Sequence, residues 1–133
     1  MVRIELTELD GLTPHEKTRV PHRRNLLARI VRNRYVTPIV ADRQSGLVLD
    51  GHHRLRVARE LGLRRIPVVF VDYGDDALEV HSRRKNIRVQ KTDVVQRASG
   101  RRLYAPKTTK HLFKGRHVSR LGSKMRVPMS ELM

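Results

Sequence analysis

The stretch VLDGHHRLRVARE, Val48 to Glu60, constrains the fold most, because an apolar strand pattern changes to a helical one within a single turn. Upstream, Thr37 to Asp42 is predicted to be a buried strand, and RQSG a tight turn. Leu47 to Asp50 is then the second strand of a hairpin. The following helix begins near His52 and ends at Gly62. A hairpin that leads directly into a helix requires a sheet with helices packed against it.

The rest of the chain supplies the other parts of such a layer. Apolar spacing predicts a short strand over Arg3–Leu6 and a helix over Pro21–Arg32. Ile66–Tyr73 is a continuous apolar run and therefore a central strand. Ala77–Ser82 is a further strand, and a short helix with Thr92 as its N-cap runs to Ser99. The predicted fold class is α+β (mixed α/β), a small mixed sheet flanked by helices.

Length and composition exclude several classes of protein. A chain of 133 residues fits one domain with a modest core, predicted over residues 1–113, followed by a basic, partly ordered tail over 114–133. The absence of cysteine excludes disulfides, thiolate catalysis and cysteine-bound zinc. No apolar run approaches the roughly 20 residues needed to span a bilayer, and no signal peptide is visible, so no membrane role and a cytoplasmic location are expected.

The formal charge of +16 predicts a polyanionic partner such as nucleic acid, a nucleotide or an anionic membrane. Between Ser82 and Arg126 there are fifteen Lys or Arg residues and one acid, Asp93. This segment is either a solvated face or a surface that contacts phosphates, with nucleic acid among the candidates.

The turn at residues 50–54 is best explained as a phosphate site. Gly51 lets a ligand approach the backbone, and the first N–H groups of the helix have no internal partner. Arg54 in the first turn can add a charge-assisted contact. Adjacent His52 and His53 point in different directions, which argues against a metal site. The simpler alternative is an ordinary turn whose Asp50 caps the helix.

Three segments, in order, resemble the ParB/sulfiredoxin superfamily. They are LTPHEKT (12–18), VLDGHHR (48–54) with RIPVVFVDY after it, and KTDVV…GRRLYAPKTTKH (91–111). The superfamily shares a phosphate-binding strand–turn–helix at the position of the second segment. The sulfiredoxin cysteine is absent here, as is the downstream helix-turn-helix domain of chromosome-partition members. The closer resemblance is to the branch of free serine kinases, which convert L-serine to O-phospho-L-serine.

This resemblance implies a role for each segment. Glu16 is the predicted catalytic base, and Asp50 is predicted to hold Mg²⁺ or to assist the acceptor hydroxyl. The turn residues Gly51, His52, His53 and Arg54 are predicted to bind the phosphates of ATP or ADP, with both histidines as donors. In extended chain Lys107, Thr109 and His111 share one side, and Thr108 and Lys110 lie on the other. Lys107, Thr108, Thr109 and His111 are predicted to help bind serine or phosphoserine.

Two features keep an alternative open. The third segment follows the core closely, so the acceptor pocket is reduced, remodelled or completed by a second subunit in a homodimer. The net charge also exceeds what a small-molecule kinase needs. The alternative function is a ParB-like regulatory protein that binds nucleotides or DNA.

Overall fold

The computed structural model describes residues 3–133 and contains a four-stranded mixed sheet in the order β1-β5-β3-β4. Its strands are β1 (Ile4–Glu8), β3 (Ile39–Asp42), β4 (Val48–Asp50) and β5 (Arg65–Val71). β1 pairs antiparallel with β5, β5 parallel with β3, and β3 antiparallel with β4. The predicted hairpin and central strand are therefore confirmed, as is the mixed fold class.

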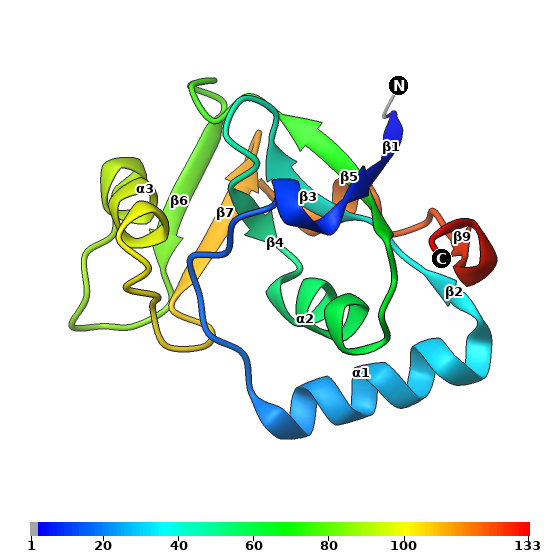
Figure 1. Ribbon diagram of the computed structural model, residues 1–133. Helices are drawn as coiled ribbons and strands as arrows, with labels where there is room; N and C mark the ends of the chain where they lie inside the picture. The colour runs from blue at the N-terminus through cyan, green and yellow to red at the C-terminus, as the bar shows by residue number, and fades with distance from the viewer. Residues whose placement is uncertain (1–2) are drawn as a thin grey trace.

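Helices α1 (Val20–Asn33) and α2 (His52–Glu60) cover one face of this sheet. Figure 1 shows α2 lying between α1 and the strands. On the other face lie α3 (Lys91–Ser99) and a three-stranded antiparallel sheet. That sheet consists of β6 (Leu78–Ser82), β7 (Thr109–Phe113) and β8 (Arg116–His117).

The central strands bury both of their faces. On β5, Ile66 and Val68 pack into the core under α1 and α2, whereas Val69 packs into the core under α3. On β3, Ile39 packs into the core under α1 and α2, and Val40 packs into the core under α3. This two-sided burial explains why β5 is a continuous apolar run rather than an alternating one.

The last twenty residues, for which a basic tail was predicted, are packed into this fold. They form β8, the short strand β9 (Val127–Pro128), which pairs with β2 (Tyr35–Val36), and two 3-10 turns. Leu132 is fully buried, and its carbonyl accepts hydrogen bonds from the backbone of Arg64 and Arg65 at 2.8 and 3.0 Å. Residues 114–133 thus contribute to the core that supports the start of β5.

One predicted helix start was wrong. The N-cap of α3 is Gln90 and not Thr92, so the helix begins at Lys91. The side chain of Asp93 accepts the Gln90 N–H at 2.8 Å and completes a capping box. Asp93 was expected only to favour the positive end of the helix, but its reciprocal hydrogen bond moves the start two residues earlier.

Gly51 makes the junction between β4 and α2 possible. It has φ of 99°, and a Cβ added there would lie 2.4 Å from Cγ2 of Ile39. Gly62, which ends α2, has φ of 68° but open space around it. The two glycines share the left-handed backbone and differ in steric contact.

This contrast predicts the cost of two alanine substitutions. Gly62→Ala should lower the free energy of unfolding by about 1 kcal/mol, the strain of a non-glycine residue at positive φ. Gly51→Ala should cost more, about 3 kcal/mol, because overpacking against Ile39 is added. Urea denaturation of both variants measures the difference. Equal losses would show that the contact with Ile39 does not constrain this turn.

Candidate functional site

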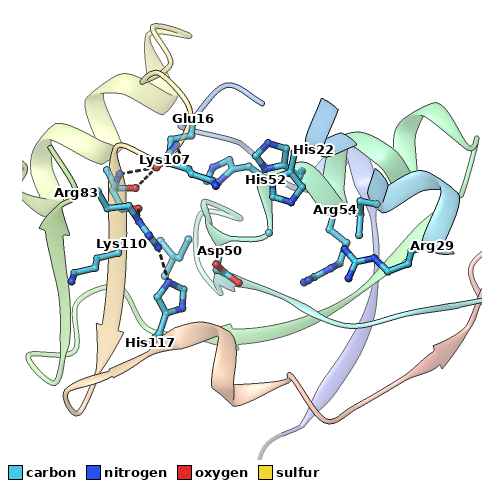
Figure 2. Close-up of a pocket in the computed structure, with 15 residues that line it drawn as sticks. Glu16, His22, Arg29, Asp50, His52, Arg54, Arg83, Lys107, Lys110 and His117 are labelled. Carbon is cyan, nitrogen blue, oxygen red and sulfur yellow. Dashed lines mark hydrogen bonds between the residues drawn. The ribbon is translucent and has the colours of Figure 1, made fainter. Parts of the chain in front are cut away.

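A pocket of about 240 Å³ opens where the predicted segments meet (Figure 2). Its wall combines the loop before α1, one face of α1, the β4–α2 junction, the chain around β6 and β7, and β8. The lining residues are Glu16, His22, Leu26, Arg29, Leu49, Asp50, Gly51, His52, His53, Arg54, Arg83, Lys107, Thr109, Lys110 and His117.

The β4–α2 junction presents an open helix start to this pocket. Gly51 is the N-cap of α2, and no side chain caps the helix. The alternative in which Asp50 caps it is therefore wrong. The N–H groups of the first turn have no partner within the helix and carry partial positive charge, so they can bind an anion.

Cations flank the junction on both sides. Figure 2 shows Asp50 between two groups of basic side chains, with Arg29 and Arg54 on one side and Arg83 and Lys110 on the other. Arg54 is held in place by a hydrogen bond to the carbonyl of Pro38 at 2.9 Å. Burial lowers the pKa of Arg54 and the nearby Asp50 carboxylate raises it, but an arginine remains a cation. The pocket can thus hold two anionic groups separated by one carboxylate.

Glu16 lies at the edge of the pocket and is largely buried. Its Oε1 accepts the backbone N–H of Lys107 at 2.9 Å. Its Oε2 accepts both the backbone N–H of Thr109 at 2.9 Å and the Thr109 hydroxyl. The carboxylate therefore joins the first predicted segment to the third, 93 residues later in the chain.

The Lys107–His111 segment does not alternate as predicted. Lys107 has φ of 57°, and this left-handed residue interrupts the extended chain. As a result Lys107, Thr109 and Lys110 all line the pocket. Thr108 instead donates to the carbonyl of Ala105, outside the pocket wall.

His111 was also predicted to contact the substrate, but it lies behind the pocket. It is completely buried, and its Nε2 is 3.0 Å from the hydroxyl of Tyr73. Burial lowers the pKa of His111 to about 3. Neither Thr108 nor His111 is part of the pocket wall, so the structure does not support the prediction that they bind the substrate directly.

His52 and His53 fasten the loop that carries Glu16. Nε2 of His52 accepts the backbone N–H of His15 at 3.1 Å, and Nε2 of His53 accepts the backbone N–H of Arg19 at 2.9 Å. In a neutral ring the proton is then on Nδ1. This loop-holding role was not predicted. Donation from the Nδ1–H groups to a phosphate stays a prediction.

Several lining residues were missed in the sequence, notably His22, Arg29, Arg83 and His117. Arg83 donates to the Thr109 carbonyl at 2.9 Å, and its Nη2 lies 3.1 Å from Nε2 of His117. Arg29 lies on α1, where its place in the pocket depends on how α1 packs on α2. No local motif marks these residues, since only the tertiary fold brings them to the pocket.

Asp50 is the side chain best suited to a magnesium ion. Within residues 3–133 no group of three or more metal-binding side chains is present. The Asp50 carboxylate lines the pocket, whereas both oxygens of Glu16 already accept hydrogen bonds. Mg²⁺ commonly binds through one or two carboxylates together with substrate phosphates and water. The residues present fit that arrangement only when a phosphate ligand supplies the other oxygens.

Similar proteins are known by sequence. The chain is 33% identical over 78 residues to a ParB-like protein of Sulfolobus acidocaldarius, which covers 59% of this chain and 39% of that protein. It is 36% identical over 81 residues to an ATP-dependent L-serine kinase of Staphylothermus marinus, which covers 56% and 32%. The match thus spans between 32% and 39% of the length of these curated relatives. No family model matches it.

The fold is that of a solved free serine kinase. The structure of that enzyme in complex with AMP has a TM-score of 0.82 and 16% identity, and the match covers 99% of this chain and 94% of the other. The predicted resemblance is therefore confirmed by sequence over part of the chain, where it matches a ParB-like protein and an L-serine kinase. The shared fold with the solved free serine kinase extends over almost the whole chain. In the described residues no helix is long and apolar enough to cross a membrane.

The two loop-holding histidines predict how stability depends on pH. Burial, and next the positive charges around it, lower the pKa of His53 to about 4, whereas an unfolded histidine titrates near about 6.5. Between these values the unfolded chain binds more protons than the folded one. Stability present at neutral pH is therefore lost as the pH falls from about 6.5 towards 4.

The variant His53→Gln should weaken this pH dependence, because a glutamine carbonyl can accept the Arg19 N–H without titrating. The measurement is the urea midpoint between pH 7.5 and 4. His81→Gln, at an exposed position on β6, is the matched control and should behave like the parent chain. An unchanged slope in His53→Gln would remove His53 as a source of the acid sensitivity.

Proposed function

We propose that this protein is a nucleotide-dependent kinase of free L-serine, which transfers a phosphoryl group to the serine hydroxyl and yields O-phospho-L-serine. The observation that carries this proposal is the placement of a buried carboxylate, Glu16, in the same pocket as an uncapped helix start and basic side chains. Phosphoryl transfer needs mainly positioning and charge stabilisation, and these groups supply both. The named relatives and the solved free serine kinase support the same reaction.

The donor nucleotide, ATP or ADP, binds with its phosphates at the start of α2. The N–H groups after Gly51 and the guanidinium of Arg54 receive the phosphate oxygens. Asp50 would hold Mg²⁺, and the ion would neutralise charge on the phosphates. Arg29 faces the same region from α1 and adds a second cation.

The acceptor binds on the opposite side of Asp50. Arg83, Lys107 and Lys110 can receive the carboxylate of the amino acid, and Glu16 takes the proton of its hydroxyl. Homodimer formation stays a prediction, as does a cytoplasmic location, where nucleotides and free amino acids are both available.

A donor-by-acceptor matrix tests the proposal. ATP, ADP and CTP are each combined with serine, threonine and homoserine in the presence of Mg²⁺, and the phosphorylated amino acids are detected by mass spectrometry. We expect O-phosphoserine with ATP or ADP. Glu16→Gln should reduce the rate by about 10²–10⁴-fold, the usual cost of losing a general base.

Glu79→Gln, at an exposed position on β6 outside the pocket, is the matched control. A thermal melt of both variants distinguishes lost chemistry from lost folding, because Glu16 also anchors the Lys107–Thr109 segment. Full activity in Glu16→Gln would show that another group is the base. No phosphorylated product with any pair of substrates would refute the kinase.

A second function is favoured by charge. Most of the fifteen basic residues between positions 82 and 126 are exposed, and several of them, including Arg101 and Arg102, lie outside the pocket. A small-molecule kinase has no use for such a surface, whereas nucleic acid binding does. We propose this as an additional or alternative role.

Salt dependence tests the nucleic acid role. Affinity for a fluorescent duplex should fall by at least about tenfold between 50 and 200 mM salt if two or more phosphates are contacted. The double variant Arg101→Gln/Arg102→Gln should bind more weakly and depend less on salt, while serine phosphorylation should be retained. Affinity that is weak and insensitive to salt would exclude the role.

A further inference from the structure

A chain of buried polar contacts runs from Glu16 away from the pocket. Oε2 of Glu16 contacts the hydroxyl of Thr109, and the same hydroxyl oxygen lies 2.9 Å from Nε2 of His15. Nδ1 of His15 lies 2.8 Å from the backbone carbonyl of Val48 on β4. His15 is 0% exposed and no water reaches its ring from outside, so these contacts must be satisfied among themselves.

The number of hydrogens available for these buried contacts determines the protonation that they require. The Val48 carbonyl only accepts, so Nδ1 of His15 carries a hydrogen. The two remaining contacts, from Nε2 to the Thr109 hydroxyl and from that hydroxyl to Oε2, need one hydrogen each. Threonine supplies only one. A neutral His15 and an ionised Glu16 are therefore one proton short of satisfying the arrangement.

We infer that Glu16, Thr109 and His15 act together as one proton acceptor, in which the proton that Glu16 takes from the substrate hydroxyl is shared with His15 through the Thr109 hydroxyl. This inference rests on the proposed kinase function and deepens it. Glu16 is the group that touches the substrate, and Thr109 and His15 are positioning residues that act through it. His15 lies in the LTPHEKT segment, but its proposed function follows from its contacts.

The step balances in protons and charge. The acceptor O–H bond breaks as its oxygen bonds to phosphorus, and the proton moves to Glu16. Glu16, Thr109 and His15 can then hold this proton in two arrangements. In one, Glu16 is a carboxylic acid that donates to Thr109, and the Thr109 hydroxyl donates to neutral His15. In the other, Glu16 has returned its proton to the Thr109 oxygen while the Thr109 hydroxyl has given its own proton to Nε2 of His15. Glu16 is then a carboxylate that accepts from Thr109, and His15 is an imidazolium that donates to Thr109.

The groups around His15 allow this role at neutral pH. Its ring faces His52 of α2 at 4.5 Å between centroids, His111 of β7 at 5.6 Å and Tyr104 at 6.4 Å. Burial lowers the pKa of both neighbouring histidines, so neither competes for the proton. Burial also lowers the pKa of His15, against the opposing effects of the Glu16 charge and the Val48 carbonyl. His15 is therefore neutral at neutral pH, and its Nε2 can take a proton.

Kinetic pH profiles give the first test. His15→Asn keeps a donor near the Val48 carbonyl but cannot accept the proton. The acid limb of kcat should therefore move to lower pH by about one unit or more. The value of kcat should fall about tenfold to a hundredfold, less than the roughly 10²–10⁴-fold cost of losing the base. KM for the nucleotide should not change, since His15 does not line the pocket.

Imidazole ¹⁵N NMR gives a test that does not depend on activity. In the parent protein Nε2 of His15 should gain its proton with a single midpoint that matches the acid limb. Thr109→Val, which removes the hydroxyl but keeps the shape, should shift the NMR midpoint and separate it from the kinetic one. Thr109→Ser, which keeps the hydroxyl, should again give an NMR midpoint that matches the kinetic one. Thr92→Val, at an exposed position on α3, is the matched control and should change neither midpoint.

The outcomes separate this inference from the kinase proposal. If no amino acid is phosphorylated but Thr109→Val and Glu16→Gln both shift the His15 midpoint, the shared proton exists and the kinase proposal fails. If serine is phosphorylated but neither variant moves the midpoint, and His15→Asn leaves the acid limb in place, the shared proton is refuted while the kinase stands. His15→Asn that lowers KM and kcat without moving the acid limb would assign His15 a purely structural role.

Discussion

The carboxylate of Glu16 is the point on which the site depends. A buried ionised carboxylate is costly unless hydrogen bonds satisfy it, and here the donors are the backbone of Lys107 and Thr109 and the Thr109 hydroxyl. The cost of burying Glu16 is therefore offset only when the third segment is folded against the first. The pocket and the fold are coupled through this one side chain, because the same contacts place Lys107 and Thr109 in the pocket wall.

The histidines of the β4–α2 junction extend this coupling to the phosphate site. His52 and His53 hold the backbone on either side of Glu16, at His15 and Arg19. The helix that begins at Gly51 thus fixes both its own open N-terminus and the loop that carries the proposed base. These two hydrogen bonds fix the distance between Glu16 and the proposed phosphate site at the start of α2. A fixed distance favours the positioning that phosphoryl transfer requires.

The local parts of this site were predictable from the sequence, and the long-range parts were not. The strand, Gly51 and the helix start follow from residue types within a few positions, so the predicted junction agrees with the structure. The buried Thr108 side chain points away from the pocket because of the left-handed backbone of Lys107, a conformation that lysine seldom adopts and that sequence patterns do not signal. The burial of His111 depends on its contact with Tyr73, 38 residues away. Family resemblance identified the right segments but could not tell which side chains face the pocket.

The distribution of charge explains why neutral histidines surround the proposed base. A carboxylate beside a guanidinium or ammonium group binds a proton weakly, since the positive charge favours its ionised form. In this pocket the guanidinium groups of Arg29 and Arg54 lie on the far side of Asp50, close to the proposed phosphate site. The rings of His15, His52 and His111 cluster behind Glu16 instead, and burial keeps them neutral. Basic side chains therefore face the pocket on both sides of Asp50, whereas uncharged imidazoles rather than further cations pack behind Glu16.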